Sequence, residues 1–234
     1  MYLLFSCDDA DQPCSKYSLA ATEDIWQNEE NLVLSYDADG LLRTVSGPYA
    51  QVSKYHYDAS RTLIKVEQAQ DTFLFAYDAK HRLISIYQER FIDSVVFSYD
   101  EANRIATTQI YRVSPDLLYY FNIEYPDSKT IKKYTYYRDP ITSNFEHKET
   151  TTYTMDENPR PYPEAYCLYL LGDEDVVLPH NPLSIDYFKG DVLTFKQIFT
   201  YRYNAGKYPI SQKETRSLSA GAEPDTYNYS YACE

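Results

Sequence analysis

The chain has 234 residues, which suits one large all-β domain and is enough for one sizeable core. Its formal charge is −13, from 22 Lys and Arg against 35 Asp and Glu, and so acidic a surface disfavours contact with nucleic-acid phosphates. With 27 Tyr, 10 Phe and only 6 Gly, the composition is too aromatic for a disordered chain and favours strands. Composition alone identifies no biochemical activity.

The first residues combine a short apolar run with a cysteine. Met1–Phe5 is followed by Ser6 and Cys7, and then by an aspartate-rich segment. This order is typical of the end of a bacterial lipoprotein signal, in which Cys7 would be acylated. The segment has no basic region before it and only a short apolar stretch. The alternative is an apolar N-terminus that packs on the domain, with an ordinary buried cysteine. We expect a truncated lipoprotein signal and tether over residues 1–22, and a single β-meander domain over residues 23–234.

Three cysteines remain if Cys7 carries lipid, namely Cys14, Cys167 and Cys233. An odd number allows at most one intrachain disulfide and one free thiol, and the sequence does not assign the pairing. No Cys/His spacing typical of zinc is present. No apolar run reaches the length of a membrane-spanning helix, so a lipid anchor at Cys7 is the membrane attachment that we expect.

A tyrosine–aspartate pair recurs at intervals of 21, 20 and 22 residues. The four pairs are Tyr36-Asp37, Tyr57-Asp58, Tyr77-Asp78 and Tyr99-Asp100. The residues six positions after each tyrosine are Leu42, Leu63, Leu83 and Ile105. A looser copy begins at Tyr125, with Ile131 at the same offset. A repeat of this length indicates one recurring supersecondary unit.

The residues of each repeat predict a hairpin. Apolar and polar residues alternate before each tyrosine, as in Phe73, Phe75 and Tyr77, which indicates a strand with one buried face. The aspartate can accept a backbone N–H two residues on and so begin a turn, while Gly40 and Asn103 tolerate positive φ. A second strand then begins at the leucine or isoleucine, and successive hairpins make an antiparallel meander.

The pattern continues more weakly to the C-terminus. Further strands are expected over residues 132–138, 150–155, 195–203, 210–218 and 226–233. Other segments are interpreted as a proline-rich connection over 156–163, a strand or helical turn over 165–171, an acidic loop over 172–182 and one short helix over 22–28. Extrapolating the repeat predicts an all-β fold, an antiparallel β-meander of roughly 12–14 strands that curves into a barrel-like sheet.

Two families resemble this chain. The turns Tyr57–Leu63, Tyr77–Leu83 and Tyr99–Ile105, each with an arginine, are similar to the YD repeat of bacterial toxin-shell proteins, although so few copies cannot enclose a cargo. The whole chain resembles a family of secreted Bacteroidetes lipoproteins of unknown function with a porin-like fold. The segments that carry this second resemblance are Leu4–Cys7, the hairpins over 31–138, Asp156-Glu157-Asn158-Pro159, Tyr201–Pro209 and the Tyr-rich end near Cys233. It implies a barrel-like sheet outside the cytoplasm and no catalytic residues.

We do not expect a membrane pore. A lipid-embedded barrel needs an unbroken apolar belt on strands of about 9–11 residues. Charged residues such as Arg43, Lys65 and Glu89 interrupt the expected strands, and the mean hydropathy is −0.56. The apolar, Tyr-rich face should therefore line a core or groove, with the charges in water.

No sequence motif indicates catalysis, a metal or a cofactor. The four histidines, His56, His81, His147 and His180, are scattered and are interpreted as surface residues. Asp173-Glu174-Asp175 could offer oxygens to calcium but has no EF-hand spacing, so a solvated loop is favoured. Paired carboxylates for glycoside hydrolysis need to be close only in space, so the sequence leaves that option open.

Tyrosines on two adjacent expected strands supply the one positive indication of a site. They are Tyr119, Tyr120, Tyr134, Tyr136 and Tyr137. Tyrosine has an apolar body and a polar tip, so it suits ordinary sheet packing as well as a contact surface for a glycan or protein.

The sequence is thus interpreted as a noncatalytic cell-envelope lipoprotein, anchored to the periplasmic or outer side of the outer membrane, that acts as a binding or scaffold module. The alternatives are a carboxylate-based hydrolase of a surface polymer and a structural element of a surface assembly. A glycan or surface protein is the expected partner, nucleic acid is not, and the oligomeric state is not predicted.

Overall fold

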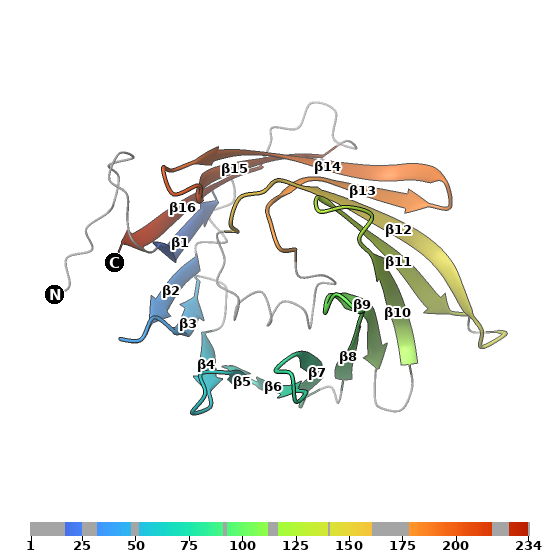
Figure 1. Cartoon of the computed structure of the whole chain (residues 1–234), viewed down its shortest axis with the longest axis horizontal. Helices are drawn as coiled ribbons and strands as arrows, with labels where there is room; N and C mark the ends of the chain where they lie inside the picture. Colours follow the sequence, from blue (N-terminus) through green and yellow to red (C-terminus); the bar gives the residue numbers. More distant parts are fainter. Residues whose placement is uncertain are drawn as a thin grey trace.

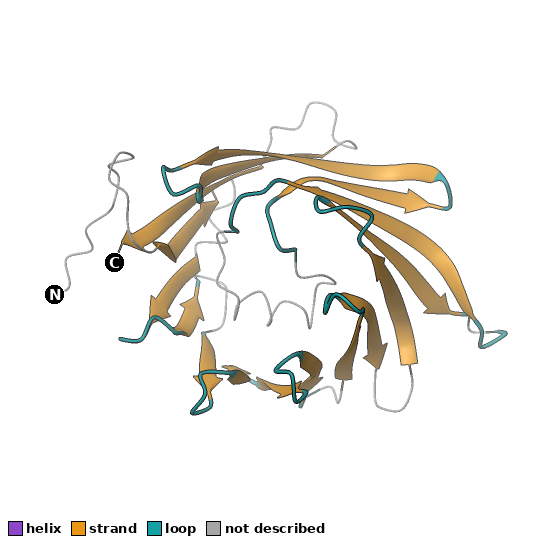
Figure 2. Cartoon of the chain, viewed as in Figure 1, coloured by secondary structure: helices purple, strands orange, loops and turns teal. Residues whose placement is uncertain are grey.

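The computed structural model describes residues 17–24, 32–47, 52–90, 93–111, 117–139, 141–160, 178–216 and 225–233. The regular elements in these ranges are 16 β-strands (Figure 2). The first eight are β1 (Tyr17–Asp24), β2 (Leu32–Tyr36), β3 (Leu42–Ser46), β4 (Ser53–Tyr57), β5 (Leu63–Gln68), β6 (Asp71–Tyr77), β7 (Leu83–Gln88) and β8 (Asp93–Tyr99). The others are β9 (Ile105–Tyr111), β10 (Leu117–Glu124), β11 (Thr130–Arg138), β12 (Phe145–Met155), β13 (Pro182–Lys189), β14 (Val192–Tyr203), β15 (Pro209–Arg216) and β16 (Asp225–Cys233).

The strands form one antiparallel ladder in chain order (Figure 1). Each strand pairs with its neighbours in the sequence, and β1 pairs with both β2 and β16, so the ladder closes into a barrel. In the closing pair, Tyr17 lies opposite Cys233 and Asp24 lies opposite Tyr227. The predicted all-β antiparallel meander with a barrel-like curve is confirmed, with more strands than the expected 12–14.

Two strands were not foreseen. The strand β1 takes in residues 17–22, which were assigned to the tether, and residues 22–24, which were assigned to a short helix. The barrel therefore includes residues 17–22, which precede the expected domain start at residue 23. The adjacent alanines in β1 are poor strand formers, and pairing on both sides overrides that weak propensity. The other unforeseen strand, β13, starts at Pro182, and a proline is tolerated at the first position of a strand.

The aspartate of each repeat organises its own turn. Oδ1 of Asp78 accepts the backbone N–H groups of Lys80 at 2.8 Å and of Arg82 at 3.0 Å. The Asp78 N–H donates to the carbonyl oxygen of Arg82 at 2.9 Å, and the N–H of His81 donates to the carbonyl oxygen of Asp78 at 3.0 Å. His81 takes a φ of 58°. The residues at the same position of the matching turns also have positive φ, and they are Gly40, Arg61, Asn103 and Lys207.

We call this arrangement the YD turn, and it occurs in more hairpins than the sequence motif indicates. Asn204 makes most of the same bonds in the turn between β14 and β15, where its amide oxygen accepts the N–H of Tyr208. Asp156 makes them between β12 and β13, where its N–H donates to the carbonyl oxygen of Asn181 and its Oδ1 accepts the N–H groups of Asn158 and Asn181. In the Asp78 turn, one residue separates the two residues whose N–H groups bond to Oδ1. In the Asp156 turn, residues 159–180 stand at that place. The long connection is therefore an insertion into a repeat turn.

A β-bulge follows six of these turns. The register shifts by one residue directly after the pairs Tyr36–Leu42, Tyr57–Leu63, Tyr77–Leu83, Tyr99–Ile105, Met155–Pro182 and Tyr203–Pro209. Each bulge places one extra residue on the second strand. Beyond it, the residues that face the interior shift by one position along that strand. In β7, for example, Leu83 and Ile86 are both buried although they are three positions apart.

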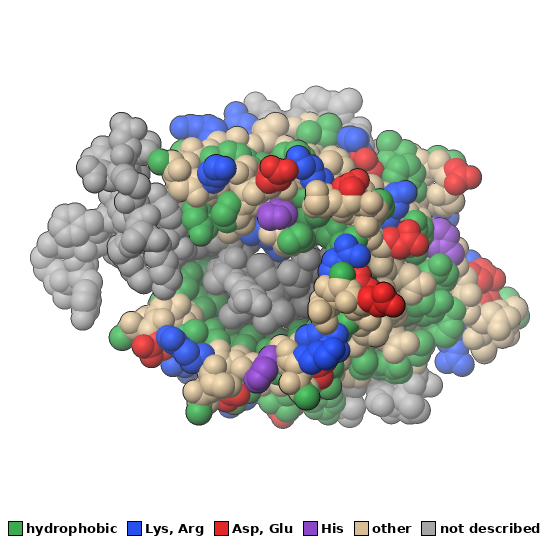
Figure 3. All heavy atoms as spheres, viewed as in Figure 1, with side chains coloured by type: hydrophobic (Ala, Val, Ile, Leu, Met, Phe, Trp, Pro, Cys, Tyr) green, Lys and Arg blue, Asp and Glu red, His purple; other side chains and the backbone are tan. Residues whose placement is uncertain are grey.

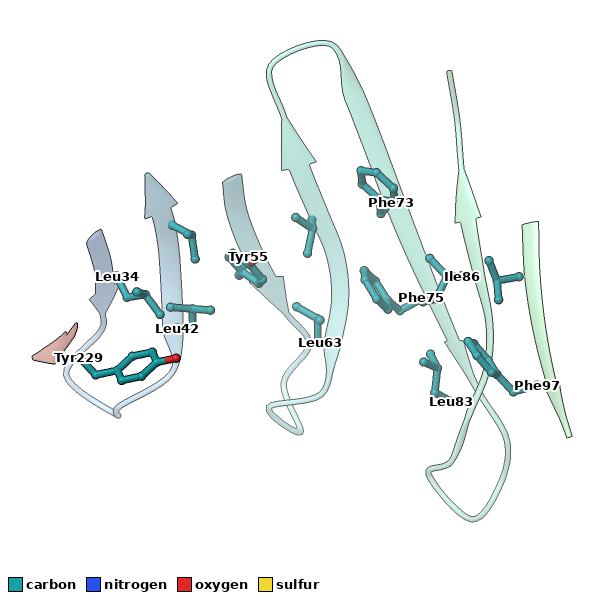
Figure 4. Close-up of a cluster of buried hydrophobic side chains, with 13 residues drawn as sticks. Leu34, Leu42, Tyr55, Leu63, Phe73, Phe75, Leu83, Ile86, Phe97 and Tyr229 are labelled. Atoms are coloured by element: carbon teal, nitrogen blue, oxygen red, sulfur yellow. The ribbon is translucent and has the colours of Figure 1, made fainter. Parts of the chain in front are cut away.

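The larger hydrophobic cluster lies on one face of β2–β8 and includes Tyr229 from β16 (Figure 4). Because the sheet closes on itself, its shielded face is the concave one, and the cluster lines the interior. Phe73 and Phe75 of β6 are 4% and 7% exposed, and such burial contributes about 1.5–3 kcal/mol for each side chain. A second cluster contains Ile123, Ile131, Tyr153, Met155 and Leu178. The expected apolar stripes are therefore the core.

Neighbouring hairpins are tied together through the tyrosine of the repeat. The Tyr99 hydroxyl donates to the carbonyl oxygen of Leu83 at 2.6 Å. The Arg82 guanidinium, which is paired with Asp78, lies 4.5 Å from the centre of the Tyr99 ring. The same ring contact joins Arg43 with Tyr57 and Arg104 with Tyr125. Each such hydrogen bond contributes about 0.5–1.5 kcal/mol, so the tyrosine, aspartate and arginine of the repeat have a structural role.

Several expectations fall outside the described residues. They concern Cys7, Cys14, Cys167, the segment 165–171 and the acidic run Asp173-Glu174-Asp175. Within the described part, no helix has the length and apolar character needed to cross a membrane. The same residues contain no group of three or more His, Cys, Asp or Glu side chains that could hold a metal ion.

Candidate binding surface

The five tyrosines singled out in the sequence lie on the neighbouring strands β10 and β11. Tyr119 is opposite Tyr137, and Tyr120 is opposite Tyr136. Strand alternation divides them between two surfaces, because successive side chains point to opposite faces. Tyr119 and Tyr137 share the concave face with the buried Phe121, whereas Tyr120, Tyr134 and Tyr136 lie on the outer face. The structure brings the five together on adjacent strands but not on one surface.

The outer tyrosines belong to a continuous line of aromatic rings. Tyr120 and Tyr136 stack with centroids 4.7 Å apart and planes 4° from parallel. The Phe145 ring lies 5.3 Å from Tyr120, and the His147 ring lies 5.4 Å from Tyr136 and 5.8 Å from Tyr134. Such separations are those of favourable aromatic pairs. We call Phe145, Tyr120, Tyr136, His147 and Tyr134 the aromatic row.

Hydrogen bonds hold one end of the aromatic row, at Tyr134 and His147. The Tyr134 hydroxyl donates to Oε2 of Glu124 at 3.0 Å. Partial burial, followed by this carboxylate, raises the pKa of Tyr134 above its ordinary value. Nε2 of His147 lies 3.0 Å from the carbonyl oxygen of Glu149 and 3.0 Å from Oγ1 of Thr150. The rings of Tyr134 and His147 are thus held in place by the protein itself.

The row contains two residues that the sequence did not indicate. Phe145 and His147 belong to β12, which was expected to begin only at residue 150, and His147 was interpreted as an isolated surface histidine. It is exposed, but it contacts two tyrosine rings. The alternation of Phe145 and His147 ahead of the threonine run was the available signal. The exposed run of charges from Glu146 to Glu149 obscured it.

The concave side of β10 and β11 differs from the outer side. The rings of Tyr119 and Tyr137 lie 5.5 Å apart, and Tyr119 also contacts Phe121 at 5.6 Å. Nζ of Lys133, a residue only 5% exposed, lies 4.8 Å from the centre of the Phe121 ring. A cation over an aromatic ring is attracted by its negative face, so this contact helps to keep a buried lysine in the interior. These residues therefore pack against one another on the concave face of β10 and β11.

A polar network continues the concave face across β13–β15. The Tyr187 hydroxyl donates to Oε1 of Gln197 at 3.0 Å, and Nε2 of Gln197 donates to Oε1 of Glu214 at 2.8 Å. Nε of Arg216 donates to the same Glu214 oxygen at 2.5 Å. The Glu214 side chain is only 8% exposed. This carboxylate is therefore held by an amide and a guanidinium.

The remaining histidines and charges are spread over the surface. His56 faces Glu67 at 3.0 Å, and Lys65 contacts the same carboxylate at 2.6 Å. His81 occupies a turn, as expected, and Nδ1 of His180 lies 3.3 Å from the carbonyl oxygen of Asn158. The space-filling view shows Lys and Arg intermixed with Asp and Glu around the barrel (Figure 3). The view shows no large area of a single charge.

No protein-family model and no curated protein matches the sequence. Two solved structures are similar to it over nearly the whole chain. One is a porin-like protein from Bacteroides uniformis ATCC 8492, with a TM-score of 0.63 at 11% identity, covering 94% of this chain and 98% of that chain. The other is a porin-like protein from Bacteroides vulgatus ATCC 8482, with a TM-score of 0.51 at 14% identity, covering 91% and 97%. The porin-like fold implied by the resemblance is confirmed: this chain has the fold of these Bacteroides proteins.

Proposed function

We propose that this protein is a noncatalytic module of the cell envelope that binds or scaffolds a surface glycan or protein. The observation that carries the proposal is the aromatic row on the outer face of β10–β12. Aromatic side chains with polar tips are enriched at binding surfaces because they offer a large contact area for little loss of conformational entropy. A row of rings that already stack on one another loses still less conformational entropy on binding.

The cellular place is part of the same proposal. The order of residues from Leu4 to Cys7 supports a lipid anchor, with Cys7 as the acylated residue. The fold shared with Bacteroides porin-like proteins supports a place in the envelope, at the outer membrane. Metabolic labelling with a radioactive fatty acid, followed by membrane fractionation, tests the anchor. Label should enter the full chain and be lost in Cys7→Ala, and an unlabelled full chain would remove the anchor from the proposal.

Among the residues that the structure describes, no observation favours either alternative. A hydrolase needs two carboxylates that face each other across a substrate. Among the described acids, Glu214 is engaged by Gln197 and Arg216, and the aspartates of the YD turns accept bonds within their own turns. A structural element that grows by strand addition needs an unpaired sheet edge. Each strand that the structure describes has a neighbour on both sides.

Retention on envelope material tests the binding function. Purified protein is passed over insoluble envelope fractions from a Bacteroides strain, and the bound fraction is measured for the wild type and for Tyr136→Ala. We expect the wild type to be retained and the variant to be retained several-fold less. Tyr87→Ala is the matched control, because Tyr87 is an exposed tyrosine on β7, away from the row. Equal retention of all three proteins, or no retention of any, would contradict the proposal.

A further inference from the structure

The outer wall around the aromatic row is free of charged residues over two adjacent lines of the sheet. Cross-strand register places Gln109, Tyr120, Tyr136 and His147 on one line. It places Thr107, Asn122, Tyr134 and Thr150 on the next. Neither line contains Asp, Glu, Lys or Arg, although such residues make up 24% of the chain. The wall there offers rings, hydroxyls and carboxamides.

Charged residues lie at the borders of these two lines and, on β12, in the bulge between His147 and Thr150, where Lys148 is paired with Glu146. On one side, Glu124 lies opposite Lys132, and the Glu124 carboxylate is already bonded to the Tyr134 hydroxyl. On the other side, Arg138 lies opposite Phe145. A polyanionic ligand would find no lysine or arginine within the lines and would meet the net charge of −13. A polycationic ligand would find no acidic cluster there.

The aromatic row also lacks the usual form of a protein-binding hot spot. Such a hot spot is a pocket that receives an aromatic or arginine anchor from the partner. Tyr120 and Tyr136 instead cover each other's faces in a stack, with Phe145 and His147 against the outer sides of that pair. The result is a ridge of rings bordered by uncharged hydrogen-bonding groups. Sugar rings match it, because their apolar C–H groups can pack along the parts of these rings that the stack leaves uncovered, and their hydroxyls pair with neutral donors and acceptors.

We propose that the aromatic row binds a neutral, hydroxyl-rich glycan chain that runs across strands β9–β12. This inference rests on the proposed binding function and names its ligand class. Rings supply the contact area, and the side chains of Gln109, Asn122 and Thr150 supply uncharged hydrogen bonds to sugar hydroxyls. The class excludes acidic polysaccharides and excludes proteins as the occupant of this surface.

The test is isothermal titration of the full chain with defined carbohydrates. The neutral probes are gluco-, manno-, xylo- and galacto-hexasaccharides, and the acidic probes are hyaluronan and polygalacturonate. We expect binding to at least one neutral series and to neither acidic polymer. Tyr136→Ala should weaken the neutral binding about tenfold, which corresponds to the loss of one aromatic contact. Tyr136→Phe should keep most of the affinity, and Tyr87→Ala should bind as the wild type does.

Circular dichroism of each variant confirms that lost binding is not lost folding. The inference is overturned if no neutral probe binds, if an acidic polymer binds through Tyr136, or if the variants bind neutral glycans as tightly as the wild type. Retention on envelope material separates the two proposals. If that retention still depends on Tyr136 while every neutral probe is silent, the ligand class is wrong and the binding function stands. If neither depends on Tyr136, both fail.

Discussion

The aspartate of the YD turn accepts more hydrogen bonds than the sequence motif alone predicts. Oδ1 of Asp78 holds two N–H groups, and Oδ2 accepts Nε of Arg82 at 2.8 Å. These donors, with the backbone N–H of Arg82 first, hold the pKa of Asp78 below its ordinary value. The stabilisation is therefore present above about pH 4, the ordinary range of a carboxyl, and is lost as pH falls through the lowered value.

Replacement of Asp78 separates its backbone bonds from its charge. Asp78→Asn keeps an amide oxygen for the turn N–H groups, and in another YD turn of the same chain the amide oxygen of Asn204 accepts the N–H of Tyr208. We therefore expect Asp78→Ala to lower the free energy of unfolding more than Asp78→Asn does, as measured by urea denaturation at neutral pH. Equal effects of the two substitutions would show that only the ion pair with Arg82 matters.

Positive φ at the fourth residue of the YD turn has a cost that one substitution can reveal. His81 has a φ of 58°, whereas the first turn has glycine at the matching position, Gly40. A left-handed conformation costs a non-glycine residue roughly 1 kcal/mol. His81→Gly should raise the free energy of unfolding by about 0.5–1 kcal/mol, and His81→Val should lower it. Denaturant titration measures both, and a stabilising valine would contradict the conformation.

At the scale of elements, the hairpins could be predicted because each repeat carries its own signals. Alternation before Tyr77, an aspartate next to it and an apolar residue at Leu83 specify a strand, a turn and a second strand. The bulge was also foreseeable, since Leu83 and Ile86 are apolar at a spacing of three inside a strand. The strand β1 could not be predicted, because its partner β16 is remote in the sequence. The aromatic row could not be predicted either, because it depends on the register between the three strands β10, β11 and β12.

The insertion between β12 and β13 should be removable, because its ends already meet in a YD turn. We predict that replacing residues 157–180 with Ala-Lys-His, the residues between Asp78 and Arg82, leaves a folded barrel. The deletion removes Leu178, which is 8% exposed in the second core cluster, so the free energy of unfolding should fall by about 2–5 kcal/mol. Leu178→Ala in the full chain should account for much of that loss. A deletion variant without a cooperative unfolding transition would contradict the prediction.

At the scale of the whole molecule, the tyrosine hydroxyls couple stability to alkaline pH. Burial raises the pKa of Tyr57 to about 12. Burial, and then the hydrogen bond to Asp156, raises the pKa of Tyr203 to about 12. Because both values exceed the ordinary value of 10.0, the native state holds these protons more tightly than the unfolded chain does. Their contribution to stability is complete below pH 10 and is lost between pH 10 and 12.

A base titration followed by tyrosinate absorbance and circular dichroism checks this coupling. Exposed tyrosines should ionise first, without loss of the β-sheet signal. The remaining tyrosines should ionise together with unfolding. Ionisation of every tyrosine near pH 10 in a chain that keeps its β-sheet signal would contradict the burial of the repeat tyrosines.

The central structural claim is that one ladder of hairpins returns to its first strand, which gives the sheet a shielded interior and an outer wall that carries the aromatic row. The most direct test uses the closing register, in which Tyr17 lies opposite Cys233. Tyr17→Cys should form a disulfide with Cys233 under mild oxidation, identified by peptide mass spectrometry, and the oxidised protein should unfold at a higher temperature than the reduced one. Failure of these two cysteines to pair in folded protein, with β1 free of β16, would contradict the barrel.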